Sequence, residues 1–374
     1  MTQRRSDQVN EDTTPYYHCV TRCVRRAFLC GEDRYSGKNF DHRRQWVVDR
    51  LILLGSIFAI DILAYAVMAN HMHLVIALRS ERAIAWSAAE VVARFGKLFP
   101  MAKAAYERMD EQQQAAKVED WRERLSDLSW MMRGLNEYLA RKANKEDGCT
   151  GRFWEGRFKS EALLDEGGLL ACMAYVDLNP VRAGECDRLE DAKWTSIGER
   201  LRKAATVGSG TPGPEAGGSE PVSVSQVEDE RNAVDSQPAL EGEDTSVPTG
   251  LAPFLDQVPE LEPLSVTDGS TEMCASRASD GAAPIPMNFV DYIELLEWTG
   301  RHQRDQGPCT LKGPPPAILS RLKIRPDGWL DAMTTHGLRS RGALGREESL
   351  CAFAQKRGRK RVAGRGFATA LFSR

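Results

Sequence analysis

Residues 61–78, DILAYAVMANHMHLVIAL, are almost entirely apolar and constrain the fold more than any other part of the chain. The apolar run is interrupted at residues 70–73, so it divides into two segments of strand length. It therefore predicts two buried strands, at residues 57–67 and 71–78, joined by a short turn at 68–70. Residues two apart on a strand point to the same face, so His71 and His73 would direct two imidazoles at one place.

A pair of imidazoles on a rigid strand is half of a plausible metal site, because neutral imidazole is a good ligand for divalent metals. The alternative interpretation is that His71 and His73 are two polar positions at a strand end, each satisfied by hydrogen bonds. The short His-x-His pattern does not decide between the two.

The order of the predicted elements indicates an α+β fold. A strand rich in arginine at residues 16–29 is followed by a helix at residues 40–54 that would end at Gly55, and then by the two strands above. Strand, helix, strand, strand is the order of a ferredoxin-like split βαβ antiparallel sheet. Residues 83–144 are expected to form helical insertions. Residues 151–164, GRFWEGRFKSEALL, again have strand character, with basic and aromatic residues interleaved.

A second segment with candidate functional residues follows at residues 165–179. Asp165 could cap a helix that continues to Asn179, where Pro180 would stop it. Tyr175 and Asn179 are four residues apart, so they share one helix face. Each also has an ordinary interpretation, Tyr175 as a half-buried core tyrosine and Asn179 as the last residue of a helix.

Composition divides the chain of 374 residues into folded and unfolded parts. Residues 1–15 are polar and expected to be disordered, and residues 201–285 are rich in Gly, Ser, Pro and acids, which predicts a flexible linker. Residues 286–374 would form a small, mainly α-helical module whose end, after residue 355, holds seven Lys and Arg and no acid. This basic tail is either a nucleic-acid contact or a solvated terminus.

The net charge of −3 conceals a basic folded part. Residues 203–284 hold 15 acidic and 3 basic side chains, so the rest of the chain carries about +9. Such a distribution favours a polyanionic partner, although ordinary surface charge would look the same. No run approaches the ~18 to 20 apolar residues of a membrane span, and nine scattered cysteines without a CxxC pair are typical of free thiols. We therefore expect a cytoplasmic protein with no membrane partner.

Three segments together resemble the single-tyrosine HUH transposases, and within them the REP-associated tyrosine transposases. These segments are NHMHLV after a strand, GRFWEGRFKS, and YVDLNPVRAG at the end of a helix. The resemblance covers residues 16–197 and implies that residues 16–200 are an HUH catalytic domain. It also implies that Tyr175 is a nucleophile forming a 5′-phosphotyrosine, and that His71, His73 and Asn179 bind Mg²⁺ or Mn²⁺. The family often has Gln at the third ligand position, where this chain has the shorter Asn179.

The resemblance further implies a partner, single-stranded DNA with hairpins, such as REP-like sequences or element ends. Backbone tracking and base stacking need basic and aromatic side chains. The candidates here are Arg22, Arg25, Arg26, Arg152, Trp154, Arg157 and Lys159. Each could equally be an ordinary structural surface residue, and Arg182 could simply cap the preceding helix. Monomeric and dimeric arrangements both remain open, as does the role of residues 286–374.

Three functions are compatible with these features. The first is a metal-dependent single-strand endonuclease and strand transferase, that is, a transposase. The second is a transposase-derived protein that binds hairpins without cutting them. The third is a metallohydrolase that uses water in place of Tyr175, whose activity would survive Tyr175→Phe.

Overall fold

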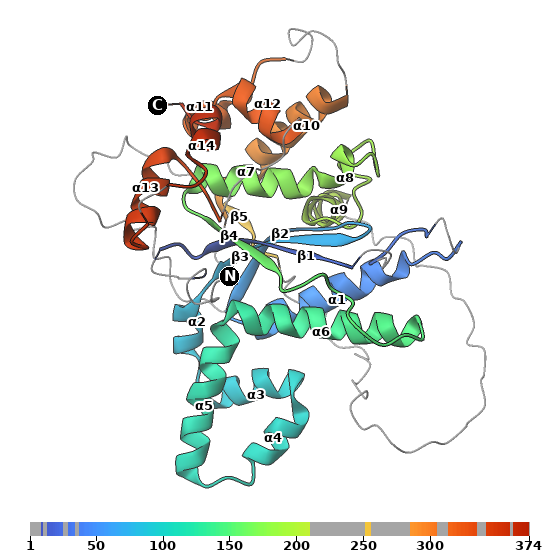
Figure 1. Ribbon diagram of the computed structural model, residues 1–374, viewed down its shortest axis with the longest axis vertical. Coiled ribbons are helices and arrows are strands. Elements are labelled where there is room, and N and C mark those ends of the chain that lie inside the picture. The colour runs from blue at the N-terminus through green and yellow to red at the C-terminus, as the bar shows by residue number, and fades with distance from the viewer. Residues whose placement is uncertain are drawn as a thin grey trace.

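The computed structural model describes residues 9, 13–24, 29–33, 37–209, 251–255, 285–304, 313–334, 342–359 and 362–373. These residues form an α+β fold around a five-stranded, mostly antiparallel sheet, which confirms the predicted class (Figure 1). The strand order in the sheet is β2-β3-β1-β4-β7. The strands of this sheet are β1 (Tyr16–Arg22), β2 (Ile60–Val67), β3 (His71–Leu78), β4 (Lys159–Leu163) and β7 (Ala343–Leu344).

Strand β3 lies between β1 and β2 and is antiparallel to both, and β1 is antiparallel to β4. Strand β7 joins the edge of β4 in the parallel direction. Two short strands, β5 (Phe254–Leu255) and β6 (Ile285–Asn288), pair with each other outside this sheet. Strand β2 is buried along its whole length, as the apolar sequence predicted, because helices cover both faces of the sheet.

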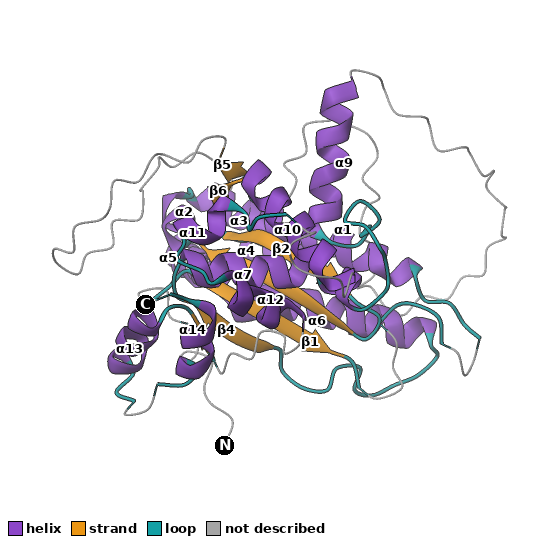
Figure 2. Ribbon diagram, turned by 90° about the horizontal axis from the view of Figure 1, so that it is seen from above, coloured by secondary structure: helices purple, strands orange, loops and turns teal. Residues whose placement is uncertain are grey.

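One face of the sheet is covered by α1 (His42–Ile57) and α6 (Leu128–Glu146), and the other by α7 (Glu166–Asp177) and α9 (Ser196–Ser209) (Figures 1 and 2). Between β3 and α6, a helical insertion projects away from α7; it contains α2 (Ser80–Ala85), α3 (Ala88–Leu98), α4 (Pro100–Tyr106) and α5 (Glu111–Ser126). This insertion agrees with the expected helical stretch at residues 83–144.

Several boundaries differ from the predicted ones. Helix α1 continues past Gly55 to Ile57, whose buried side chain holds one more turn against the core, so β2 starts only at Ile60. Residues 151–164 form a strand only at Lys159–Leu163, preceded by an isolated bridge between Cys23 and Trp154.

Helix α7 is buried on nearly all sides. Ten of its residues are buried, from Gly167 to Asp177 with only Tyr175 omitted. The reason lies in the C-terminal helices α10 (Phe289–Arg304), α11 (Ala317–Arg321), α12 (Pro326–Thr334), α13 (Glu347–Lys356) and α14 (Arg365–Leu371). Several of them lie over the outer face of α7, so that it becomes an inner layer (Figure 1).

The sequence predicted that Pro180 would stop the helix, but the chain remains helical after it. After a break at Leu178, the short helix α8 (Asn179–Arg182) begins, with Pro180 in its first turn. Proline is tolerated there because the amide it lacks would have no partner within the helix.

The C-terminal residues are in direct contact with the rest of the fold. Besides the β4–β7 pairing, the Arg346 backbone N–H and the Ser349 hydroxyl both donate to Asp165 Oδ2, each at 2.7 Å. The described residues do not include most of the predicted linker at 201–285. Of the predicted N-terminal stretch at 1–15, they include only residues 9 and 13–15. The division into domains stays a prediction. Within the described part of the chain, no helix is long and apolar enough to cross a membrane.

Candidate active site

The two histidines of the NHMH segment, His71 and His73 of β3, lie on the face of the sheet that α7 covers. On β3, His71 pairs with Arg22 and His73 with Val20 of β1, so these four side chains share one face. The rings of His71 and His73 lie 4.9 Å apart, centroid to centroid, with their planes at 75°. The strand thus directs both imidazoles at one place, as the sequence predicted.

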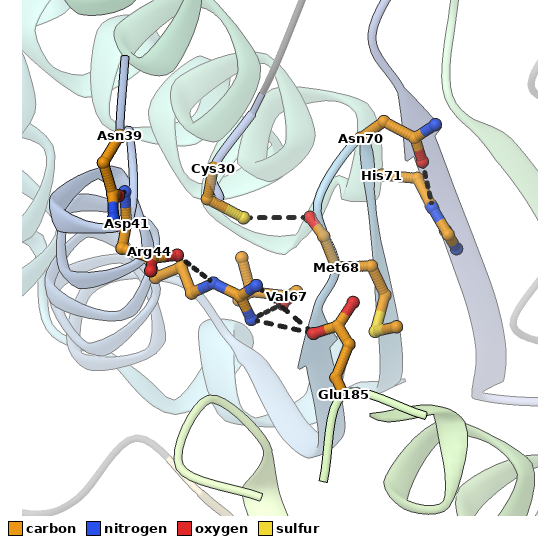
Figure 3. Close-up of polar contacts among 9 residues, drawn as sticks. All are labelled: Cys30, Asn39, Asp41, Arg44, Val67, Met68, Asn70, His71 and Glu185. Atoms are coloured by element: carbon orange, nitrogen blue, oxygen red, sulfur yellow. Dashed lines mark hydrogen bonds and ion pairs between the residues drawn. The ribbon is translucent and has the colours of Figure 1, made fainter. Parts of the chain in front are cut away.

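The turn between β2 and β3 is held by hydrogen bonds to its backbone carbonyls (Figure 3). The thiol of Cys30 donates to Met68 O at 3.1 Å, and the Cys23 N–H donates to Asn70 O at 2.9 Å. Because the carbonyls on either side are fixed, the position at which His71 enters β3 is fixed as well. Asn70 Oδ1 lies 2.7 Å from His71 Nδ1, which orients the ring itself.

Arg44 of α1 connects this turn to the chain that follows α8 (Figure 3). Its guanidinium donates to Val67 O at 2.9 Å and forms an ion pair with Glu185 at 3.2 Å. The end of β2 and the segment after Arg182 are therefore joined through one side chain.

Both histidines favour the neutral form. Burial, followed by the charges of Arg22 and Arg182, lowers the pKa of His71 to about 4. Burial, followed by the neighbouring His18 and His71, lowers the pKa of His73 well below its ordinary value. A neutral imidazole has a free lone pair, so at neutral pH both rings have the electronic state that a metal ligand needs.

Tyr175 stands against this histidine pair. Its ring lies edge-on to His73, with centroids 5.9 Å apart and planes at 80°. It is half-buried, and among the α7 residues between Gly167 and Asp177 it alone is not fully buried. The predicted proximity of the helix tyrosine and the strand histidines is therefore present in the structure.

Arg182 forms hydrogen bonds with both Tyr175 of α7 and Asn179 of α8. The sequence analysis did not predict this role for Arg182. Its Nη2 donates to Tyr175 Oη at 2.8 Å and to Asn179 Oδ1 at 2.9 Å, and its guanidinium carbon lies 4.1 Å from the centre of the Tyr175 ring. The sequence also allowed Arg182 to be a simple cap of the preceding helix, but its contacts with Tyr175 and Asn179 give it a different role. A spacing of seven and three residues from Tyr175 and Asn179 was the available signal, since both spacings fall on one helix face.

Asn179 is 3% exposed, and its Nδ2 is buried without a hydrogen-bond partner. Its oxygen already accepts from Arg182, so a metal ion would have to use that oxygen's second lone pair. Among the residues that the structure describes, no three or more His, Cys, Asp or Glu side chains are arranged to hold a metal ion. The predicted set of His71, His73 and an amide is of a different kind, with two imidazoles, which are a donor type that divalent metals accept.

The residues predicted to contact DNA differ in their exposure to solvent. Arg22, Arg152, Arg157 and Lys159 are exposed, and Arg22 lies beside His71. Trp154 is only 9% exposed and its indole N–H donates to Asn136 O at 2.9 Å, so a base could stack on it only if this segment moved. Arg25 and Arg26 lie outside the described residues.

A third histidine lies in the site and was not singled out from the sequence. His18 of β1 is 6% exposed, and its Nε2 lies 2.9 Å from His73 Nδ1. The only sequence signal is the spacing of four between His18 and Arg22, which puts both on one face of a strand.

Comparison with known proteins gives one match. No family model and no curated protein matches the chain. One solved structure, a REP-associated tyrosine transposase bound to a REP hairpin, aligns with 55% of this chain and 87% of its own, at 14% identity and a TM-score of 0.33. A likeness at this TM-score does not assign a function to this chain.

Proposed function

We propose that this protein is a transposase-type enzyme, a metal-dependent endonuclease and strand transferase for single-stranded DNA beside hairpins, in which Tyr175 is the nucleophile. The observation that carries the proposal is the contact of Tyr175 with both Arg182 and His73. A tyrosine that served only packing would not need a partly buried guanidinium at its oxygen and a histidine pair at its ring edge.

The chemistry is a transesterification. Attack of Tyr175 Oη on a DNA phosphorus forms a phosphotyrosine ester to the 5′ end and breaks the bond to the 3′ oxygen, which takes up a proton and leaves as a hydroxyl. A second 3′ hydroxyl can reverse the step on another strand, because the ester conserves the bond energy. No nucleotide cofactor is required.

Arg182 is placed to stabilise the negative charge that develops on Tyr175 Oη in this step. A free phenol titrates only near pH ~10, so at neutral pH the attacking oxygen needs help in losing its proton. A guanidinium 2.8 Å from Tyr175 Oη stabilises the phenolate and also attracts the phosphate that Tyr175 must reach.

His71 and His73, with Asn179 as a third ligand, would hold the Mg²⁺ or Mn²⁺ ion. Such an ion would polarise the scissile phosphate, and imidazole ligation favours Mn²⁺ on affinity. The protein's own part is to keep both rings neutral and converging, and to exclude water by burying His73 under α7.

Substrate and architecture follow the same proposal. Exposed Arg22, Arg152, Arg157 and Lys159 would bind the phosphate backbone of a single strand, with REP-like or element-end hairpins as the recognised form. We also infer that β1, α1, β2 and β3 are a ferredoxin-like split βαβ unit, because β3 lies between β1 and β2. A monomer or homodimer in the cytoplasm is compatible with a site built from one chain.

The test is a denaturing gel of the protein incubated with labelled single-stranded hairpin oligonucleotides from the surroundings of its gene. With Mn²⁺ or Mg²⁺ we expect a covalent adduct that disappears in Tyr175→Phe and in His71→Ala. Tyr106→Phe, in the distant helix α4, is the matched control and should keep the adduct.

Two outcomes would replace the proposal. Hairpin binding without an adduct in either metal would indicate a non-catalytic hairpin-binding protein. Cleavage that persists in Tyr175→Phe would indicate a hydrolase that uses water.

A further inference from the structure

We propose that His18 and Glu161 are positioning residues that hold His73 with its proton on Nδ1, so that His73 Nε2 is the atom offered to the metal ion. The inference rests on the proposed function, because it assigns these residues a role toward that metal. It extends the site from β3 across β1 to β4.

The sheet brings the three side chains into line. Strand β1 lies between β3 and β4, and its His18 is directly opposite Glu161 of β4. On the other side His18 pairs with Val75, and His73 is the diagonal neighbour on the same face. Glu161, His18 and His73 thus follow one another across three adjacent strands.

The contacts follow the same order. Glu161 Oε2 lies 3.8 Å from His18 Nδ1, beyond hydrogen-bond distance but close enough for the carboxylate charge to act on that nitrogen. His18 Nε2 lies 2.9 Å from His73 Nδ1, and the two ring planes are within 9° of parallel. Glu161 Oε1 accepts from the Gly342 backbone N–H at 3.2 Å, so the carboxylate is itself held in place by the C-terminal chain just before β7.

The carboxylate decides which histidine donates. At 2.9 Å, His18 Nε2 and His73 Nδ1 share one proton. If it sat on His18, that neutral ring would turn a bare lone pair at Nδ1 toward the Glu161 carboxylate, and the two acceptors would repel. With the proton on His73 Nδ1, His18 carries its own proton on Nδ1, facing the carboxylate. The second arrangement is the favourable one.

The consequence is that His73 presents an unprotonated Nε2. His71 reaches the same state by a different route, since its Nδ1 lies 2.7 Å from Asn70 Oδ1 and an amide oxygen can only accept. Metal-binding histidines generally donate their other ring N–H to an oxygen acceptor or carboxylate, which fixes the ring and its tautomer. Here a histidine backed by a carboxylate would serve as that acceptor for His73.

The tautomers can be measured without metal. The chain has six histidines, so selective ¹⁵N labelling of the full chain with single substitutions would assign each signal in long-range ¹H–¹⁵N correlation spectra at neutral pH. We expect the Nδ1–H tautomer for both His18 and His73. An Nε2–H tautomer at His73 would overturn the inference.

A metal titration tests the consequence. We expect His18→Leu, which removes the acceptor, to weaken Mn²⁺ binding about 10- to 100-fold in calorimetry. His18→Gln, whose amide oxygen can accept from His73 Nδ1, should restore binding to within a few-fold. The control is His42→Leu on the exposed part of α1, with no change expected, and circular dichroism would check that each variant is folded.

The outcomes separate the two proposals. If folded His18→Leu and His18→Gln lost Mn²⁺ affinity equally, the positioning role would be overturned. Wild-type protein that binds no Mn²⁺ while His73 is the Nδ1–H tautomer would overturn the metal part of the proposed function. Wild-type binding with His73 as the Nε2–H tautomer would overturn the present inference alone.

Discussion

The hydroxyl of Tyr292 donates a hydrogen bond to Asp177 Oδ2 at 2.7 Å, and both residues are fully buried. Asp177 lies two residues after Tyr175 at the end of α7, whereas Tyr292 lies on α10, more than a hundred residues later. The other oxygen, Asp177 Oδ1, accepts from the Ser196 hydroxyl and from the Ile197 N–H at the start of α9. One carboxylate therefore fixes the end of the tyrosine-bearing helix to two later helices.

Removal of the Tyr292 hydroxyl should destabilise the fold. In Tyr292→Phe the Asp177 carboxylate loses a donor in a place that water does not reach, and a hydrogen bond to a charged group contributes about 1.5–3 kcal/mol. We expect the free energy of unfolding, measured by urea titration, to fall by that order. Tyr106→Phe, which removes a hydroxyl from a half-buried tyrosine of the insertion, should change it by far less. Equal stabilities of the two variants would contradict this reading of Asp177.

Stability should fall as the pH decreases from about 6.5 to about 4. The pKa of His71 is about 4 in the folded protein and near ~6.5 in an unfolded chain, so in this window the unfolded state binds more protons. Protonation therefore favours unfolding, and the contribution of His71 is complete only above pH ~6.5. His73 acts in the same direction, since its pKa is also lowered.

This dependence can be measured from urea unfolding at several pH values between 4 and 7. In His71→Gln the slope of stability against pH should become shallower, because one titrating group is removed. The control is Met101→Gln, which changes an exposed side chain of α4 that does not titrate and should leave the slope close to that of the wild type. A slope unchanged in His71→Gln would contradict the lowered pKa.

Arg182 should matter for the rate of adduct formation more than for DNA binding. Loss of one preorganised donor to a developing oxyanion typically costs about 10²–10³-fold in rate. We expect Arg182→Ala to lose about that much in single-turnover adduct formation at saturating DNA. Arg182→Lys should recover part of the rate, since an ammonium keeps the charge but not the planar fork. The control is Arg188→Ala, which removes an exposed arginine of the following segment and should keep the wild-type rate.

The sequence predicted the local geometry correctly where that geometry depends on residues close in the chain. The spacing of two within NHMH and the spacing of four from Tyr175 to Asn179 are local, and strand and helix geometry convert them into shared faces. His18 was missed because its partnership with His73 depends on the register of β1 against β3, which no local pattern reveals. The burial of α7 was missed for a similar reason. Its outer face is covered by chain from beyond residue 285, a contact that no pattern within residues 165–179 reveals.

Gly168 should not tolerate a methyl group, although it lies inside a helix. A Cβ at this position would lie 2.7 Å from Leu344 O, a backbone atom of β7 that cannot move without breaking the β4–β7 pairing. Glycine inside a helix usually costs about 0.5–1 kcal/mol relative to alanine, so Gly168→Ala would be stabilising if β7 were loosely attached. We expect instead a net loss of about 1–3 kcal/mol from overpacking.

Gly300 of α10 is the matched position for that experiment. It too lies inside a helix, but a Cβ built on it meets no heavy atom within 4 Å. Gly300→Ala should therefore stabilise the protein by about 0.5–1 kcal/mol, because it gains helix propensity without a clash. Opposite signs for the two substitutions in urea titrations would support close packing of β7 on α7. A stabilising Gly168→Ala would mean that the C-terminal chain leaves this helix often enough for the clash not to matter, and the tyrosine could then be reached from that side as well.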